Sequence, residues 1–383
     1  MNILFISPYP PMEDGIADYT KKLVDELSRN VNNEIIIVSL KQKKLNNNKV
    51  FYTLSFNPLD LLKTYFLLKN KNLSVIHLQY DFSSYMLLTF PILFLLLMLR
   101  IFSKTKIVVT FHEAKRDLEL YGVFSLVFYR CISIIFHRIY THTTESLYVL
   151  KYNYKINNLK LKLIPHGTYV FKDKNNYSKE LVKKFNIDNN KLNLLFFGYI
   201  YKAKGIEYLI KATSLLQETN KYKGRFNLII VGGIRERNGL FKFFEKRNLQ
   251  YLQTLKLLVK TLGVNKQVKF IGFLKDKYIY SIFKNSDILI LPYTSVDQSG
   301  VLNIALAAQT PTIASNIGGF KDTLKHSGIL VPPKNAVKIF EGIVNLDSNR
   351  KLYNKIKKEY KNINLEQSTR NVSLKLIHDY ENL

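Results

Sequence analysis

Cysteine is almost absent from this chain, and its shortage limits where the protein can work. Cys131 is the single cysteine among 383 residues, so no disulfide can form within the chain. This usage fits a reducing compartment. The first residues, Asn2 to Ser7, form a short strand pattern with no basic region before it, so we expect no secretory signal and a cytoplasmic protein.

Acidic residues are also scarce relative to basic ones. The chain has 57 Lys and Arg against 29 Asp and Glu, a formal net charge of +28. Such an excess predicts an anionic partner, which could be a phosphate-rich ligand, an anionic lipid surface or nucleic acid. A coding bias toward Lys, Asn, Ile and Tyr would explain the same composition without any partner. No basic–aromatic recognition motif accompanies the charge, so we expect no nucleic-acid binding.

One apolar stretch raises the question of a membrane. The uncharged run over 83–99 is near the lower length limit for a span, and Pro91 lies inside it. A strand pattern over Ile107 to Phe111 follows shortly afterwards, which favours a crossover helix. The segment from Val123 to Tyr140 is similarly apolar and aromatic. Three interpretations remain: contact with a lipid interface, ordinary core helices, and, least favoured, a true span.

The length suits two domains, and short apolar runs alternate with helical patterns along the chain. This alternation predicts an α/β protein with parallel, doubly wound sheets. In the first part, strands are expected over 3–6, 35–39, 74–78, 106–111, 138–143 and 160–164, with a helix over 16–29. In the second part, strands are expected over 192–197, 226–231, 268–271, 288–291 and 312–315, with helices over 205–217, 235–262, 276–284 and 301–308.

A polar, Lys- and Asn-rich region between Val170 and Lys191 marks the expected domain boundary. We predict a first domain over 1–170, a linker over 171–191 and a second domain over 192–360. A charged helix is expected over 361–383, and it could pack back onto the first domain. Ligands of doubly wound sheets bind at the carboxyl ends of the strands, so we expect the two domains to face a central cleft.

The stretch over 287–319 is the most informative in the chain. A buried strand is followed by a polar loop that ends in Gln298, Ser299 and Gly300, and a helix begins at Val301. The first N–H groups of a helix lack backbone acceptors and carry partial positive charge, and a small residue there lets a phosphate approach. These residues therefore predict an anion site, with an ordinary βαβ crossover as the alternative.

A second loop in the same domain predicts another anion site. Gly198 ends a strand, and Lys202 and Lys204 precede the next helix, where they could neutralise a diphosphate. Gly232 and Gly233 end a neighbouring strand. Two anion sites in one domain suit a nucleoside diphosphate. No cluster of metal ligands is evident in the sequence, so we expect no cofactor, no metal site and no essential Mg²⁺.

Polar residues also follow strands of the first domain. Asp14 and Gly15 lie at a strand-to-helix turn that could border an anion, although a plain turn is the simpler interpretation. His112 directly follows a strand and could contact a substrate hydroxyl. His77 and Gln79 end the neighbouring strand, so we expect them to contribute to a polar cleft.

In their order and spacing, these motifs resemble glycosyltransferase family 4, the group 1 enzymes with the GT-B fold of two Rossmann-like domains. The resemblance covers nearly the whole chain. It is carried by ISPYPPMEDGIADYT, VVTFHE, LIPHGT, FFGYIYKAKGIEYLIKA, IIVGG and VKFIGF, and by the segment from SDILILPY through QSGVLNIALAAQTPTIASNIGG to GILVPP.

The resemblance implies sugar transfer from a nucleoside-diphosphate donor, a GDP- or UDP-sugar, with retained anomeric configuration. It implies that the second domain holds the donor, with Lys204 and Lys202 at the diphosphate together with the N–H groups of Ser299 to Val301. His112 would contact the sugar from the first domain, and Gly15 would border the acceptor. Closure of the cleft would exclude water from the reaction.

Two departures from the family pattern affect the donor contacts. The family usually has an Arg before the KG lysine, and Tyr199 and Tyr201 occupy the candidate positions here. It also usually has two Glu eight positions apart. Asp297 stands near the first, and the second falls on Ile304 or Ala305. A subset with Q-S-G-V-L in this region is similar to this chain, so the departure need not mean inactivity.

We therefore predict a hexosyltransferase-type enzyme that moves a sugar to a glycan or lipid-linked saccharide acceptor in surface polysaccharide or glycoconjugate synthesis. The basic composition and the apolar helices fit an acceptor in an anionic leaflet, which places the protein at the inner face of the cell membrane. The alternative, motivated by the missing Arg and Glu, is a non-catalytic nucleotide-sugar-binding or scaffold subunit of a glycan-assembly complex.

Overall fold

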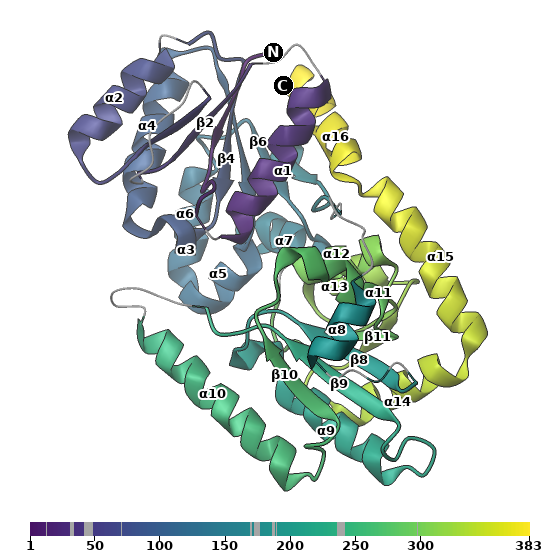
Figure 1. Cartoon of the computed structure of the whole chain (residues 1–383). Helices are drawn as coiled ribbons and strands as arrows, with labels where there is room; N and C mark the ends of the chain where they lie inside the picture. The colour runs from purple at the N-terminus through teal and green to yellow at the C-terminus, as the bar shows by residue number, and fades with distance from the viewer. Residues whose placement is uncertain are drawn as a thin grey trace. The chain divides into compact units, whose positions relative to one another are not determined.

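The computed structural model of the chain divides into two compact units. It describes residues 1–12, 14–30, 34–41, 49–69, 71–168, 171, 177–185, 188, 190–235, 242–296 and 298–383. Unit 1 comprises Met1–Gly167 and Gln367–Leu383, and unit 2 comprises Thr168–Glu366. Unit 2 therefore begins just before the expected linker and includes α8 (Ser178–Phe185) from within it (Figure 1).

Among the described residues, unit 1 is built on a 7-stranded parallel sheet in the order β3-β2-β1-β4-β5-β6-β7. The order reverses between β1 and β4, so the loops after these strands diverge to opposite sides. The strands are β1 (Ile3–Ile6), β2 (Ile35–Leu40), β3 (Val50–Leu54), β4 (Val75–Tyr80), β5 (Lys106–Phe111), β6 (Arg138–Thr141) and β7 (Leu161–Leu163).

Helices cover both faces of this sheet, as its almost continuously apolar strands require. On one face, α1 (Gly15–Asn30) and α16 (Thr369–Glu381) share a core with alternate strand residues. On the other face, the core includes residues of α2 (Pro58–Lys69), α4 (Thr89–Phe102) and α6 (Val123–Ile132). Shorter helices are α3 (Phe82–Tyr85), α5 (Ala114–Tyr121) and α7 (Thr144–Tyr148).

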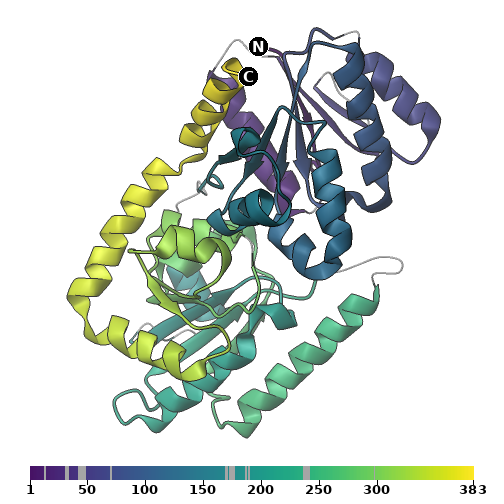
Figure 2. The ribbon, with the colours of Figure 1, turned by 180° about the vertical axis from the view of Figure 1, so that it is seen from behind.

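The C-terminal helix α16 is an integral part of unit 1 (Figure 2). It packs along α1 and buries Tyr380 beneath the sheet. The neighbouring Asp379 is also buried, and it accepts a hydrogen bond from the Tyr140 hydroxyl at 2.6 Å. Arg138 lies 3.2 Å from the same carboxylate, and Lys162 pairs with its other oxygen. A buried carboxylate that is paired and hydrogen-bonded in this way holds the helix in one position.

Unit 2 contains, in its described residues, a 6-stranded parallel sheet in the order β10-β9-β8-β11-β12-β13. The order reverses between β8 and β11, and ligands of doubly wound sheets bind outside the carboxyl ends of the strands at such a point, which is called the crevice below. The strands are β8 (Leu192–Phe197), β9 (Phe226–Val231), β10 (Val268–Gly272), β11 (Ile288–Leu291), β12 (Thr312–Ser315) and β13 (Ile329–Val331). The remaining helices are α9 (Ile206–Glu218), α10 (Lys242–Thr261), α11 (Ile279–Lys284), α12 (Gly300–Ala308), α13 (Gly318–Leu324), α14 (Ala336–Ser348) and α15 (Arg350–Glu366).

The apolar run over 83–99 does not form one long helix. It is divided into α3, a 3₁₀ turn over Met86–Leu88 and the 14 residues of α4. Pro91 lies in the first turn of α4, where its missing N–H costs no intrahelical hydrogen bond. Of the helices within the described ranges, none has both the length and the apolarity needed to cross a membrane, so the interpretation as a span is wrong.

Candidate functional site

The crevice of unit 2 is lined by two loops that are bonded to each other. One loop follows β8 and the other follows β11. The N–H of Thr294 donates to the carbonyl of Ala203 at 2.9 Å. Gly205 has a φ of +61°, and a Cβ on it would lie 2.0 Å from the carbonyl oxygen of Pro292. Only glycine allows this approach, so it fixes the lysine-bearing loop against the loop that leads to α12.

The predicted glycines after β8 and β9 serve the same close packing. Gly198 donates its N–H to Val231 at 3.0 Å, and Ile200 donates to Gly233 at 2.9 Å. A Cβ on Gly232, which has a φ of +132°, would lie 1.9 Å from the carbonyl oxygen of Gly198. These glycines allow the backbone segments that follow β8 and β9 to approach each other closely at the strand ends.

Lys204 is held at the crevice by an aromatic ring that the sequence did not identify. Its Nζ lies 3.6 Å from the ring centroid of Tyr293, a fully buried residue directly after Pro292. Burial lowers the pKa of Lys204 to about 7. The ring face favours the ammonium form, and an arriving anion would favour it further. Lys202, in contrast, is exposed to solvent.

The start of α12 provides the second predicted anion site. Ser299 is its N-cap, and the Ser299 hydroxyl accepts a hydrogen bond from the Leu302 N–H at 3.4 Å. The N–H groups of Gly300 and Val301 are the first of the helix and have no intrahelical acceptor. Gly300 is exposed, and the space where its Cβ would point is open. Gln298 is partly buried beside them, whereas Asp297 lies outside the described residues.

The two departures from the family pattern have different structural settings. Tyr199 is exposed, with its ring edge-on to Phe273 at 5.7 Å, and Tyr201 is exposed with its ring 5.3 Å from the Nζ of Lys204. Ile304 and Ala305 are buried on α12. Aromatic rings therefore replace an arginine, and core aliphatic groups replace a carboxylate. An aromatic residue within two positions of a strand end was the sequence signal that could have identified Tyr293 and Phe273.

In unit 1, His77 and Gln79, which were expected to contribute to a polar cleft, are fully buried. They point toward α16, where the Tyr380 hydroxyl bonds to His77 Nδ1. Gln79 Oε1 lies 2.8 Å from Nε2 of His112, which is partly exposed at the end of β5. Burial, the largest cause, and the nearby His142 lower the pKa of His77 to about 3. Both residues therefore lie in the core of unit 1, and Gln79 contacts His112 from there.

His112 belongs to a cluster around Tyr19, a buried residue of α1. The rings of His112, His142 and His166 have centroids 5.4, 5.3 and 4.5 Å from that of Tyr19. His142 donates from Nδ1 to the carbonyl of Ile164 at 2.8 Å. Burial lowers the pKa of His142 to about 4 and of His166 to about 3, and holds that of His112 well below its usual value. These imidazoles are therefore neutral at pH 7.

Asp14 lies at the start of α1, at the strand-to-helix turn that the sequence indicated. Its carboxylate caps α1 and accepts hydrogen bonds from the N–H groups of Ile16 at 2.8 Å and Ala17 at 3.4 Å. A negative side chain thus already occupies this helix terminus. Gly15 remains exposed, with open space where a Cβ would point.

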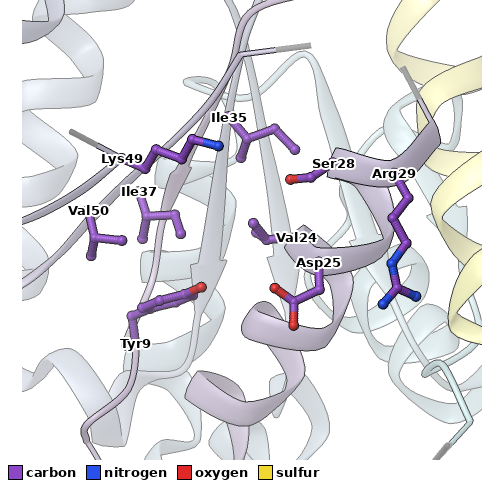
Figure 3. Close-up of a pocket in the computed structure, with 9 residues that line it drawn as sticks. All are labelled: Tyr9, Val24, Asp25, Ser28, Arg29, Ile35, Ile37, Lys49 and Val50. Carbon is purple, nitrogen blue, oxygen red and sulfur yellow. The ribbon is translucent and has the colours of Figure 1, made fainter. Parts of the chain in front are cut away.

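A groove of about 890 Å³ lies elsewhere in unit 1, between α1 and the strands β2 and β3 (Figure 3). Buried aliphatic side chains form its floor, and charged groups lie at its edge. None of the predicted site residues lines it. Its lining is Tyr9, Val24, Asp25, Ser28, Arg29, Ile35, Ile37, Lys49 and Val50.

Three carboxylates of unit 1 also lie close together. Asp81, Glu113 and Asp117 each place one oxygen within 4.8 Å of the others. Arg116 already pairs with Glu113 at 2.5 Å, and the Tyr129 hydroxyl donates to Asp117 at 2.5 Å. Burial, the largest cause, raises the pKa of Asp117 to about 6. Protein groups thus compensate much of this negative charge.

Part of the chain is similar to a known family of enzymes. Residues 178–363, which lie within unit 2, match the family of glycosyl transferases group 1. An uncharacterised glycosyltransferase of Methanocaldococcus jannaschii is 30% identical over 164 residues, which span 42% of this chain and 37% of that relative. A second glycosyltransferase of the same organism is 28% identical over 226 residues, which span 56% of this chain and 52% of the relative.

Solved structures resemble the fold of the whole chain. Sucrose-phosphate synthase of Thermosynechococcus elongatus has a TM-score of 0.76 at 17% identity, with 100% of this chain and 98% of that chain covered. Anabaena HepE in complex with UDP has a TM-score of 0.75 at 15% identity, with 100% of both chains covered. At these identities the likeness concerns the fold. The expectation of two Rossmann-like domains of the GT-B type is confirmed.

Proposed function

We propose that this protein binds a nucleoside-diphosphate sugar in the crevice of unit 2 and transfers the sugar with retained configuration. One observation carries the proposal. Lys204, whose Nζ lies over the Tyr293 ring, and the N-terminus of α12 lie on two loops that are hydrogen-bonded to each other. HepE, which shares the fold, was solved with UDP and with UDP-glucose, so a UDP-sugar is the first donor to test.

The proposed chemistry follows from where charge develops. As the bond between sugar and diphosphate breaks, negative charge grows on the leaving diphosphate. The Lys204 ammonium and the N–H groups of Gly300 and Val301 would stabilise that charge in a preorganised site. Lys202 is exposed and would add long-range attraction. His112 has a neutral imidazole, which would form hydrogen bonds with the transferred sugar.

We further propose that a bound metal ion is not essential, because lysine and helix dipole would meet the phosphate charge. The test is thermal stabilisation by nucleoside diphosphates and their sugars, first without metal and then with Mg²⁺. A UDP-sugar should raise the melting temperature in both conditions. Lys204→Ala should abolish the shift, whereas Lys256→Ala, which removes an exposed lysine from α10, should retain it.

Stabilisation that requires Mg²⁺ would contradict metal independence. Donor binding without turnover across a panel of acceptors would favour the alternative of a non-catalytic nucleotide-sugar-binding subunit. No stabilisation by any donor would overturn the proposed function.

We propose a glycan or lipid-linked saccharide as the acceptor, with unit 1 bound to an anionic membrane surface. Two helices of unit 1 carry exposed apolar stripes, which include Phe94 and Ile101 on α4 and Val127 on α6. The same helices contain Arg100 and Arg130 and no acidic residue. Apolar groups beside cations favour insertion at the surface of an anionic leaflet.

Sedimentation with liposomes tests this surface. The protein should bind vesicles that contain phosphatidylglycerol, and less so in high salt or with neutral lipid. Phe94→Ser and Val127→Ser together should weaken binding, because each removes apolar contact with the interface. Leu257→Ser is the matched control, since Leu257 on α10 is 64% exposed, as is Phe94. Equal binding by all variants would contradict the proposal.

A further inference from the structure

A chain of buried hydrogen bonds runs through unit 1 from the C-terminal helix to His112. The Tyr380 hydroxyl of α16 bonds to Nδ1 of His77. Nε2 of His77 lies 2.7 Å from the Thr110 hydroxyl and 3.2 Å from Nε2 of Gln79. Oε1 of Gln79 lies 2.8 Å from Nε2 of His112. The chain thus connects the helix with the residue expected to act on the sugar.

The chemistry of the Gln79 amide assigns the protons along this chain. In the orientation that the structure gives the Gln79 amide, its nitrogen donates to Nε2 of His77, so the proton of His77 is on Nδ1. An amide oxygen only accepts, so Nε2 of His112 must donate to it. His112 therefore carries its proton on Nε2, and its Nδ1 has a lone pair available to a ligand.

The backbone holds these groups at fixed distances. His77 and Gln79 are two residues apart on β4, so their side chains share one face of the sheet. Gln79 pairs in register with Thr110 on β5, and the N–H of His112 donates to the carbonyl of Tyr80 at 3.1 Å. His77 and Gln79 are fully buried, so water does not compete for the amide.

We propose that Gln79, oriented by His77 and Tyr380, is a positioning residue that keeps the proton of His112 on Nε2 and presents the Nδ1 lone pair to a substrate hydroxyl. This inference rests on the proposed function for its consequence in turnover, and on unit 1 alone for its geometry. It makes the C-terminal helix a determinant of the tautomer of His112 at the end of β5.

Two substitutions separate the effect of the amide from that of packing. Gln79→Leu keeps the approximate volume and removes both hydrogen bonds, so it releases the proton of His112 from Nε2. Gln79→Glu keeps an acceptor oxygen for the Nε2–H of His112, so it should retain that tautomer. Tyr140→Phe is the matched control, because Tyr140 bonds to Asp379 on the same face and lies outside the chain of hydrogen bonds.

Long-range ¹H–¹⁵N correlation of histidine-labelled protein is the first test, with His112→Gln to assign the signal. We expect the Nε2–H tautomer for His112 in wild type, Gln79→Glu and Tyr140→Phe, and a shift toward Nδ1–H in Gln79→Leu. An Nδ1–H tautomer in wild type, or an unchanged tautomer in Gln79→Leu, would overturn the proposal. Thermal melts of each variant confirm that the compared proteins are folded.

Turnover with the UDP-sugar found by thermal stabilisation is the second test. Gln79→Leu should lower kcat by roughly 10- to 100-fold, because a misplaced reacting group loses orientation. Its donor KM should change less than kcat, since the proposed diphosphate contacts belong to unit 2 and only the sugar would contact His112. Gln79→Glu should recover part of kcat with a displaced pH profile. Equal kcat in Gln79→Leu and wild type would overturn the positioning role, whereas no turnover in wild type would contradict the proposed function itself.

Discussion

At the scale of single residues, the protonation of Lys204 should control donor affinity. Burial lowers its pKa to about 7, so the amine loses its charge as the pH rises above that value. A diphosphate binds the ammonium form, and binding above this pH must therefore take up a proton. Affinity for a UDP-sugar should fall roughly 30-fold between about pH 6 and about pH 8.5. Calorimetry in buffers of different ionisation enthalpy measures both the affinity and the proton uptake.

The control for this prediction is Lys204→Arg, whose guanidinium stays charged throughout that range. Its affinity should vary little with pH, whatever its absolute value. An equally steep pH dependence in Lys204→Arg would show that another group is responsible.

A second residue-scale prediction concerns Gly205. Gly205→Ala places a Cβ 2.0 Å from the Pro292 carbonyl, in addition to the strain of a φ of +61°. The substitution should separate the two loops of the crevice and abolish stabilisation by a UDP-sugar. Gly263→Ala has the same kind of strain at a φ of +68°, but the space around its Cβ is open. It should lower the free energy of unfolding by only about 1–2 kcal/mol and leave donor binding intact. Donor-dependent melting curves distinguish the two variants.

At the scale of elements, Asp379 should decide whether α16 stays docked. Asp379→Ala leaves the cations of Arg138 and Lys162 without their buried partner and removes the acceptor of Tyr140. We expect a loss of about 2–4 kcal/mol in the unfolding free energy of unit 1, less than for a fully buried pair because Lys162 is partly exposed. Hydrogen exchange read by mass spectrometry should show faster exchange in α16 and β6.

Glu341→Ala is the comparison, because its ion pair with Lys338 is about half exposed on both sides. Its effect on the unfolding free energy should stay below about 1 kcal/mol. Unchanged exchange in α16 of Asp379→Ala would contradict the docking role.

The elements that sequence patterns predicted are those with apolar runs bounded by glycine, proline or polar loops. Strands such as β8 and β11 are buried along most or all of their length, so local composition was sufficient. β13 was missed because three residues are too short for a periodic signal, and β3 because it follows a polar region.

For the candidate site, loop positions were predictable but side-chain partners were not. His77 was expected in a cleft because it lies toward the end of a strand. Its direction is set by Tyr380, a residue 303 positions away, which no local pattern could indicate. Likewise, the contact between the Lys204 ammonium and the Tyr293 ring depends on the packing of two loops that are distant in sequence.

At the scale of the whole molecule, the buried neutral histidines should make unit 1 sensitive to acid. His77, His112, His142 and His166 have pKa values below the ordinary 6.5, so the unfolded chain binds protons that the folded unit does not. Their contribution to stability is complete above pH 6.5 and falls as the pH drops toward their folded values. Each histidine should lower the free energy of unfolding by about 1 kcal/mol as the pH falls from about 6.5 to about 5.5. Urea unfolding at several pH values measures the loss.

Asp117 acts in the opposite direction, because its raised pKa means that the folded protein takes up a proton first as the pH falls. It is one group against the four histidines and the partly buried His137, whose pKa burial also lowers to about 4, so the net stability of unit 1 should still decrease. A free energy of unfolding that stays constant from about pH 7 to about pH 5.5 would contradict this balance.

The attachment of α16 to unit 1 also sets an order for synthesis of the protein. The residues of unit 2 form one continuous segment, whereas unit 1 needs both the first 167 residues and the segment from Gln367. On the ribosome, unit 2 can therefore complete its core while the earlier-made strands of unit 1 still lack Asp379 and Tyr380. The part of the chain that is translated first reaches its finished state last, and its half-covered sheet must be protected from aggregation until α16 emerges.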